Sequence, residues 1–310
     1  MTTSETGIPL TVGRAWWLVR RDIERGFAAA WHDHFTSTLI LDRRISVPKA
    51  HADDTSPPVH VLAGEEQWLM AAWMLTSFLH FTDRPWNIFV HDDGTLSENA
   101  RAELIRLFDG ITIVPRSDAD VVMKDTLGMY PRCAAYRDAH PLGIKCFDIP
   151  HMAKGERFLL LDSDVLFFKR PDQILAWAED ENDHSTWFNQ DPQEPSSLSL
   201  DQCQSDLGFS LWPRVNSGLC LLHKDSIRLT NFEQWLELAA IKNGIAWRTE
   251  QTLLALGASR TGKGGLLPEG YEVSLGKTRK PDAIARHYVG AVRSRFYAEG
   301  VRDLKGCLLN

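Results

Sequence analysis

The stretch Phe-Leu-Leu-Leu-Asp-Ser-Asp-Val-Leu-Phe-Phe at residues 158–168 places two acids, Asp162 and Asp164, inside an otherwise apolar run. A run of this length without a helical stripe is typical of a strand buried on both faces of a parallel sheet. Unpaired carboxylates would be costly there. Because side chains at i and i+2 share one face, the two acids would direct their oxygens at one point, as Mg²⁺ or Mn²⁺ requires. The alternative is that they are ordinary turn acids at the end of the strand.

Strand and helix patterns alternate from residue 59 onward. The predicted order is strand 59–63, helix near 66–80, strand 87–91, helix near 97–109, strand 111–114, helix near 141–149 and strand 158–161. Such alternation predicts an α/β fold with a mainly parallel sheet covered by helices on both faces. Ligands of these sheets bind beyond the carboxyl ends of the strands, where Gly64, Asp92–Asp93 and Asp162–Asp164 fall. Residues 191–214 predict a long loop, which in a compact domain often carries function.

The N-terminal part predicts a separate helical arm. Between Arg14 and Leu39 the apolar residues recur every four positions, at Val19, Ile23, Phe27, Trp31 and Phe35. This amphipathic helix is expected to pack against the protein's own core; the alternative is peripheral contact with a membrane or a partner protein. The breaker cluster at residues 53–58 separates the arm from the main part of the chain. We therefore expect an extension at 1–56 and one main domain at 57–310.

The composition excludes several classes of protein. A net charge of −7 argues against nucleic acid as a partner, because duplex binders normally carry a basic surplus. The five cysteines are odd in number and lack metal-ligand spacing, which favours free thiols. The chain shows neither a signal-peptide pattern nor 18 consecutive apolar residues. We expect a cytoplasmic protein.

Three further motifs follow the Asp-x-Asp strand in a fixed order. They are Val215-Asn216-Ser217-Gly218-Leu219, Glu250-Gln251-Thr252-Leu253-Leu254 and His287-Tyr288-Val289-Gly290-Ala291-Val292-Arg293. Together with the first strand and turn, this set resembles the GT-A nucleotide-sugar glycosyltransferases, most closely the glycogenin-like members of glycosyltransferase family 8. The resemblance covers about residues 57–300 and implies a GT-A fold, with a Rossmann-like central sheet.

The resemblance also implies an activity and a set of ligands. These enzymes transfer a sugar, with retention, from a nucleotide diphosphate donor, here most simply a UDP-sugar, with Mn²⁺ or Mg²⁺ bridging the diphosphate. Asp162, Asp164 and His287 match the metal ligands of the family. The residues expected to contact the donor are Ala63, Gly64, Trp68, Ser163, Gly218, Gly290 and Arg293. Those expected near the chemistry are Lys145, Asn216, Glu250 and Gln251.

Each of these assignments has a structural alternative. Trp68 fits core packing on an amphipathic helix, and Lys145 fits a solvated surface. His287 fits a satisfied core or surface histidine, and Asn216 fits a turn. Glu250 fits the start of a helix, where an acid favours the dipole.

The chain also departs from the family pattern. Glu250 stands where the family has Asp, and Arg293 stands where it has Lys; nothing resembles an acceptor site. Two other interpretations remain open. One is a haloacid-dehalogenase-like phosphatase, whose nucleophile also occupies an Asp-x-Asp strand. The other is an inactive nucleotide-sugar-binding protein.

Overall fold

The computed structural model describes residues 34–41 and 56–309. Most of the predicted arm, Arg14–Leu39, lies outside these residues, and its role stays a prediction. Residues 34–41 pack against the domain, because Ile40 is fully buried and the Trp73 indole donates to the Ser37 carbonyl at 3.0 Å. Phe35 is 62 % exposed, so its expected place on the buried stripe is wrong. Within the described ranges, no helix has the length and apolar character needed to cross a membrane.

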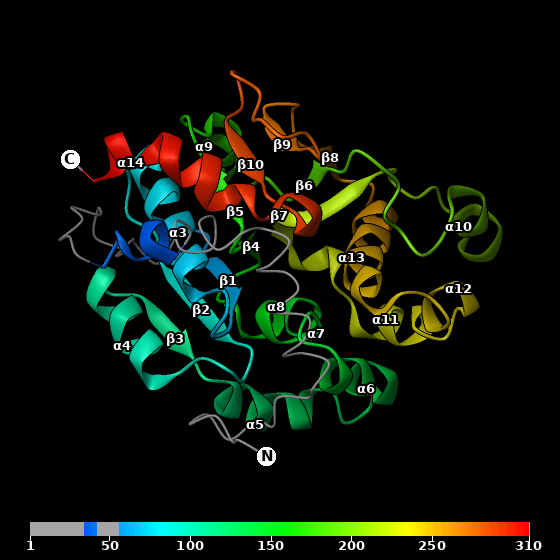
Figure 1. Cartoon of the computed structure of the whole chain (residues 1–310). Helices are drawn as coiled ribbons and strands as arrows, with labels where there is room; N and C mark the ends of the chain where they lie inside the picture. The colour runs from blue at the N-terminus through cyan, green and yellow to red at the C-terminus, as the bar shows by residue number, and fades with distance from the viewer. Residues whose placement is uncertain (1–33, 42–55, 310) are drawn as a thin grey trace, which may run out of the picture.

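A seven-stranded sheet forms the centre of the described domain (Figure 1). Its strands, in spatial order, are β3 (Thr112–Val114), β2 (Ile88–Asp92), β1 (Val59–Ala63), β4 (Arg157–Asp162), β7 (Val215–His223), β6 (Thr186–Gln190) and β8 (Gly264–Leu266). Neighbouring strands run parallel except in the two pairs that include β7. The predicted α/β class with a mainly parallel sheet is confirmed.

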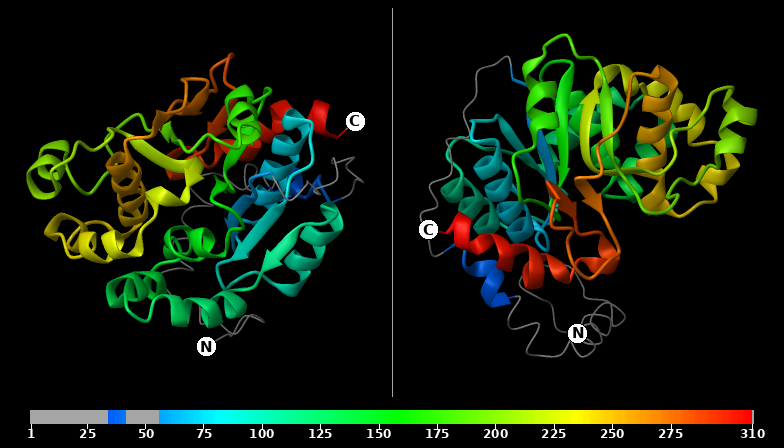
Figure 2. Two further views of the ribbon diagram at one scale, coloured as in Figure 1. Left: turned by 180° about the vertical axis from the view of Figure 1, so that it is seen from behind. Right: turned by 90° about the horizontal axis from the view of Figure 1, so that it is seen from above.

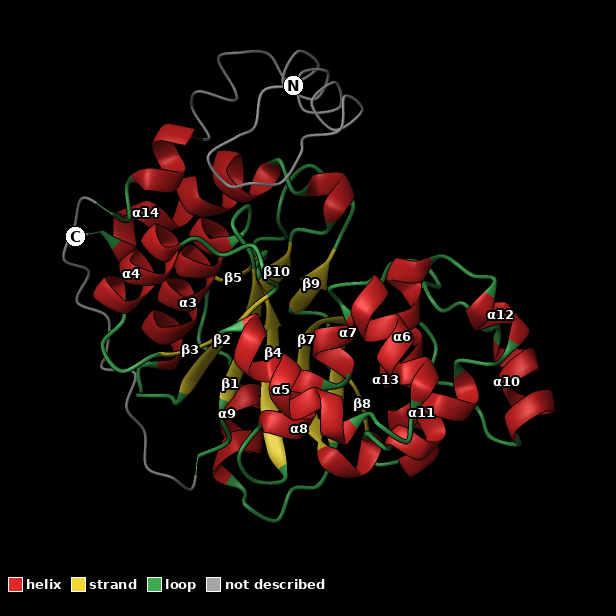
Figure 3. Cartoon of the chain, turned by 90° about the horizontal axis from the view of Figure 1, so that it is seen from below, coloured by secondary structure: helices red, strands yellow, loops and turns green. Residues whose placement is uncertain are grey.

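Helices cover both faces of this sheet (Figure 3). One apolar core lies against α3 (Trp68–Thr82), α4 (Glu98–Leu107), α9 (Asp172–Glu179) and α14 (Arg302–Leu308). The other lies against α5 (Arg116–Thr126), α6 (Pro131–Ala139), α7 (Gly143–Cys146), α8 (Asp148–Met152), α10 (Leu200–Leu207), α11 (Leu229–Trp235), α12 (Ala239–Lys242) and α13 (Ala246–Thr261). Strand β4 serves both cores by alternation, with Leu159 and Leu161 in the first and Phe158 and Leu160 in the second. This explains why its sequence is apolar from Phe158 to Leu161.

A smaller sheet joins the end of the chain to the Asp-x-Asp segment. Its strands are β5 (Val165–Phe167), β10 (Ala285–His287) and β9 (Tyr271–Val273). After β10 the chain continues through η2 (Gly290–Val292) and η3 (Phe296–Val301) into α14, which packs beside α3 (Figure 2). Helix α14, near the end of the described chain, therefore packs against α3, the first helix of the main domain.

Two local predictions need correction. The helix expected near 141–149 is two short helices, α7 and α8, and α5 and α6 were not expected at all. The reason is the weak apolar pattern of these segments: α5 buries only Ala119 and Met123, and α6 buries only Cys133 and Arg137. The five cysteines, all within the described ranges, are free thiols, as predicted.

A buried ion pair holds the segment that carries Lys145. The Arg137 guanidinium of α6 donates to both carboxylate oxygens of Asp148 in α8, at 2.8 and 2.6 Å. Helix α7 lies between them in sequence, and a Cβ on Gly143 would stand 2.6 Å from the Arg137 Cα. The close approach permitted by Gly143 and the ion pair together fix α7 against α6.

We predict that Asp148→Ala lowers the free energy of unfolding by about 3–5 kcal/mol, because it leaves the buried Arg137 charge without its main partner. The matched control is Asp138→Ala, since Asp138 is 74 % exposed and lies 3.7 Å from the same guanidinium. It should cost less than about 1 kcal/mol. Asp120 keeps its contact with Arg137 in both variants. Equal losses in urea unfolding would contradict the prediction.

Candidate active site

The Asp-x-Asp acids lie at the carboxyl edge of the parallel strands, with Asp162 at the end of β4 and Asp164 in the turn to β5. Strand register aligns Leu62 with Asp162 and Ala63 with Asp92 along this edge. His287 reaches the same turn, with its Nε2 3.0 Å from an Asp164 oxygen and 3.8 Å from an Asp162 oxygen. One ligand atom from each of Asp162, Asp164 and His287 lies within 4.8 Å of the others. The sequence-predicted metal ligands are therefore brought together.

Strand pairing and a glycine place His287 here. In the small sheet His287 pairs with Val165, and the Tyr288 amide donates to the Asp164 carbonyl at 2.8 Å. The imidazole lies over Gly218, where a Cβ would be 2.2 Å from two ring atoms. Gly218 is thus needed for the approach of the histidine ring, which the sequence did not reveal.

Asn216 sets the orientation of the His287 ring. Its amide nitrogen donates a hydrogen bond to Asp191 at 2.9 Å. Its oxygen therefore faces His287 Nδ1 at 2.8 Å and accepts a hydrogen bond from it. The His287 Nε2 then points toward the two acids. A histidine fixed through one nitrogen by a carbonyl, with the other free for an ion, is the usual arrangement of a metal ligand.

Two basic side chains balance the charge of Asp164. Burial alone would raise the pKa of Asp164, but His287 and the Arg293 guanidinium, bound to its second oxygen at 3.0 and 2.8 Å, lower it below the usual value. Burial would lower the pKa of His287, and the charge of Asp164 outweighs burial and raises it. Asp164 is therefore a carboxylate held between the His287 imidazole and the Arg293 guanidinium.

Lys145 connects the acids to helix α13. Its side chain is 2 % exposed, and Nζ contacts Asp162 at 2.8 Å, Glu250 at 3.1 Å and the Ser217 carbonyl at 3.2 Å. Burial would lower its pKa, and the charges of Asp162 and Glu250 raise it instead. Burial and the negative charge of Asp162 raise the pKa of Glu250. The positive charge of Lys145 lowers it, but this effect is smaller than the other two together. The solvated-surface alternative for Lys145 is wrong.

Glu250 does not begin its helix. It lies in the second turn of α13, buried, and accepts from the Ser217 hydroxyl at 2.9 Å. Next to it, Gln251 accepts from the Ser217 amide at 3.0 Å. The Gln251 Nε2 is buried without a hydrogen-bond partner among the described residues.

A pocket of about 540 Å³ opens beside these side chains. Among its lining residues are Lys145, Asp162, Asn216, Glu250, Gln251, His287, Gly290 and Arg293, all predicted from the sequence. The prediction missed Asp191, Ser217, Trp247 and Arg248, which also line it. Ser217 stood inside a recognised motif and Asp191 in the loop predicted at 191–214, whereas Trp247 and Arg248 carried no signal.

The remaining predicted donor-contacting residues do not line this pocket. Trp68 is 8 % exposed and belongs to the apolar core, as its packing alternative proposed. Ala63 and Ser163 are also buried at the strand ends. Gly64 allows the Asp93 carboxylate to approach, since a Cβ would lie 2.3 Å from it. Donor contacts by these residues stay predictions.

The sequence matches no protein-family model and no curated protein. Among solved structures, galactosyltransferase LgtC, in complex with donor and acceptor sugar analogs, is similar at 15% identity and a TM-score of 0.51, over 82% of this chain and 96% of that one. The bifunctional glycosyltransferase WbbM gives 12% identity and a TM-score of 0.51, over 82% of this chain and 51% of its own length. These two similarities show the GT-A fold.

Replacement of Gly218 tests the packing of His287. Gly218→Ala should destabilise the protein by about 1–3 kcal/mol, because the new methyl group and the imidazole compete for one space. The control is Gly290→Ala, since no described heavy atom lies within 4 Å of a Cβ there. It should change stability by at most about 0.5 kcal/mol. Urea unfolding compares them, and an equally mild Gly218→Ala would show that the ring is not confined.

Proposed function

We propose that this protein is a metal-dependent glycosyltransferase that moves a sugar from a nucleotide-diphosphate-sugar donor, most simply a UDP-sugar, to an acceptor with retention. The observation that carries the proposal is the meeting of Asp162, Asp164 and His287 at the carboxyl edge of a GT-A sheet, beside a pocket of about 540 Å³. Residues 57–310 would form the catalytic domain and 1–56 an extension. The similarity to family 8 rests on the motifs alone.

The three candidate ligands, Asp162, Asp164 and His287, fit a Mn²⁺ or Mg²⁺ ion. Two carboxylates and one imidazole suit Mn²⁺ well, and Asn216 already presents the His287 Nε2 to the acids. When bound, the ion would act as a Lewis acid that stabilises the leaving diphosphate. Arg293 is half-exposed at the pocket, where its guanidinium would bind a phosphate group bidentately.

The polar residues of α13 fit a role near the sugar. Gln251 offers a buried donor with no protein partner among the described residues, and it lines the pocket. Such a group costs free energy unless a ligand oxygen accepts from it. Glu250 is held by Lys145 and Ser217, which suits electrostatic stabilisation of an oxocarbenium-like transition state better than attack as a free nucleophile.

The other interpretations are weaker. The GT-A fold contradicts the haloacid-dehalogenase-like phosphatase. An inactive binder would keep the pocket and the metal ligands, but it would have no need for the buried carboxylate of Glu250 in the pocket lining. Catalysis therefore explains more of the site.

Donor hydrolysis tests the proposed activity. With Mn²⁺ and a panel of UDP-sugars, the protein should release UDP from at least one, and Asp164→Asn should reduce this rate at least 100-fold. Asp138→Asn, on the exposed surface, should leave it unchanged. NMR of the first product should show the α configuration from an α-linked donor. Release that persists without divalent metal, or a β product, would refute metal dependence or retention respectively.

Glu250→Gln tests the role assigned to that carboxylate. The variant keeps a side-chain oxygen for Ser217 but removes the charge, so turnover should fall by at least 100-fold while donor affinity changes less than threefold. A matched change, Glu233→Gln, alters an acid of α11 that binds Arg132 outside the pocket and should leave turnover intact. Near-normal turnover in Glu250→Gln would give the residue a purely structural role.

A further inference from the structure

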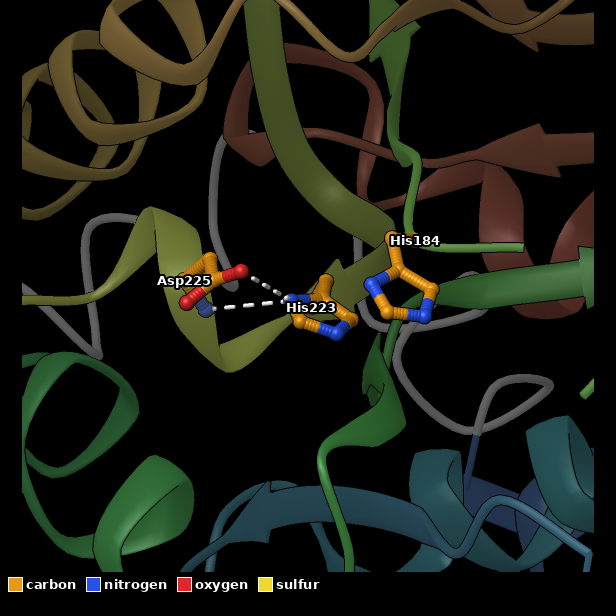
Figure 4. A group of neighbouring side chains, drawn as sticks. All are labelled: His184, His223 and Asp225. Carbon is orange, nitrogen blue, oxygen red and sulfur yellow. Dashed lines mark hydrogen bonds and ion pairs between the residues drawn. The ribbon is translucent and has the colours of Figure 1, made fainter. Parts of the chain in front are cut away.

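A second group of histidine and aspartate side chains, of the types that bind metals, lies at the other end of the central strands, away from Asp162 and Asp164. Figure 4 shows its three side chains. His223 is the last residue of β7, and Asp225 follows it in η1 (Lys224–Ser226). His184 precedes β6, which pairs with β7. Because β7 carries Asn216 at its other end, the two groups are separated by the length of that strand.

The spacing of the ligand atoms suits a tetrahedral ion. One ligand atom from each of His184, His223 and Asp225 lies within 4.8 Å of the others, and His223 Nδ1 is 3.6 Å from an Asp225 oxygen. Two ligands at about 2.1 Å from a tetrahedral Zn²⁺ stand roughly 3.4 Å apart. The two imidazoles are stacked, with ring centres 4.6 Å apart and planes inclined by 16° (Figure 4). The rings must therefore turn for one nitrogen of each to face the same ion.

Two of the side chains already hold partners that an ion would share or replace. His223 Nδ1 accepts from the Asp225 amide at 3.1 Å, so an ion bound at this nitrogen would replace that hydrogen bond. Arg228 holds one Asp225 oxygen, which leaves the other facing His223. The two neighbours of His184 are joined by a hydrogen bond, in which the Asp183 carboxylate accepts from the Ser185 amide at 2.8 Å.

Space remains for further ligands. His184 and His223 line two hollows, one of about 490 Å³ and one of about 400 Å³. A site with three protein ligands and solvent at the fourth position has room for a water molecule or an anion. Arg260 and Lys263 line the smaller hollow and favour an anion there.

We propose that His184, His223 and Asp225 form a second metal site, for a transition-metal ion of the Zn²⁺ type. Two imidazoles and one carboxylate select Zn²⁺, Co²⁺ or Ni²⁺ over Mg²⁺ and Ca²⁺, which prefer oxygen ligands. The ion ties the start of β6 to the end of β7, and so supports the strand that presents Asn216 and Gly218. This site does not depend on the proposed sugar transfer.

The test uses the full chain with the first metal site removed by Asp162→Ala and Asp164→Ala. In that background, equilibrium dialysis should find one Zn²⁺ per chain, Co²⁺ should give the visible absorption of a tetrahedral ion, and Zn²⁺ should raise the melting temperature. Adding His184→Ala should weaken Zn²⁺ binding at least 100-fold and abolish both other signals. Adding His151→Ala, at another exposed histidine, should change none of them.

The variants also show when the assignment is wrong. His184 is exposed, so His184→Ala should melt like its parent in EDTA. Zn²⁺ binding that survives both His184→Ala and Asp225→Asn would overturn the site, as would no Zn²⁺ binding in the background protein. Stabilisation by inorganic phosphate in EDTA, without Zn²⁺ binding, would reassign the group to an anion.

Discussion

The charge of two acids at the end of a buried strand is the constraint on which the rest of the site depends. Strand β4 supplies side chains to both apolar cores, so its last residues can carry charge only where other groups compensate it. Lys145, His287 and Arg293 provide that compensation from three distant segments. The fold of the second half of the domain is therefore tied to the chemistry of Asp162 and Asp164.

This compensation explains features that look unrelated along the chain. Gly218 has no side chain because an imidazole needs its space, and Asn216 carries an amide because that imidazole must be held through Nδ1. The small sheet pairs His287 with Val165, the residue that follows Asp164, and thereby holds the imidazole beside the two acids. A divalent ion in this place would share the Asp164 carboxylate with the Arg293 guanidinium, so metal binding and the position of Arg293 would be coupled.

Sequence-based prediction of the fold worked best where a residue type suits few environments, as acids do in an apolar strand. The apolar run of β4 predicted the parallel sheet, and the motifs pointed to Asp162, Asp164 and His287, which the fold brings together. Contacts between side chains far apart in sequence were out of reach: the pairing of Lys145 with Glu250 and the ring over Gly218 depend on how α13 and β10 return to the sheet. Helix α5 was missed because its buried face is only Ala119 and Met123.

The two groups of metal-ligating residues differ in a way that bears on their chemistry. The one at the carboxyl edge has two carboxylates and one imidazole, so its ligand atoms suit a hard divalent ion. The one at the other end of the central strands has two imidazoles and one carboxylate, so it suits an ion held for its geometry. Strand β7 begins beside the first group and ends in the second. An ion at the second group would restrain β7 at His223, and it would thereby limit how far Asn216 and Gly218 move at the other end of the same strand.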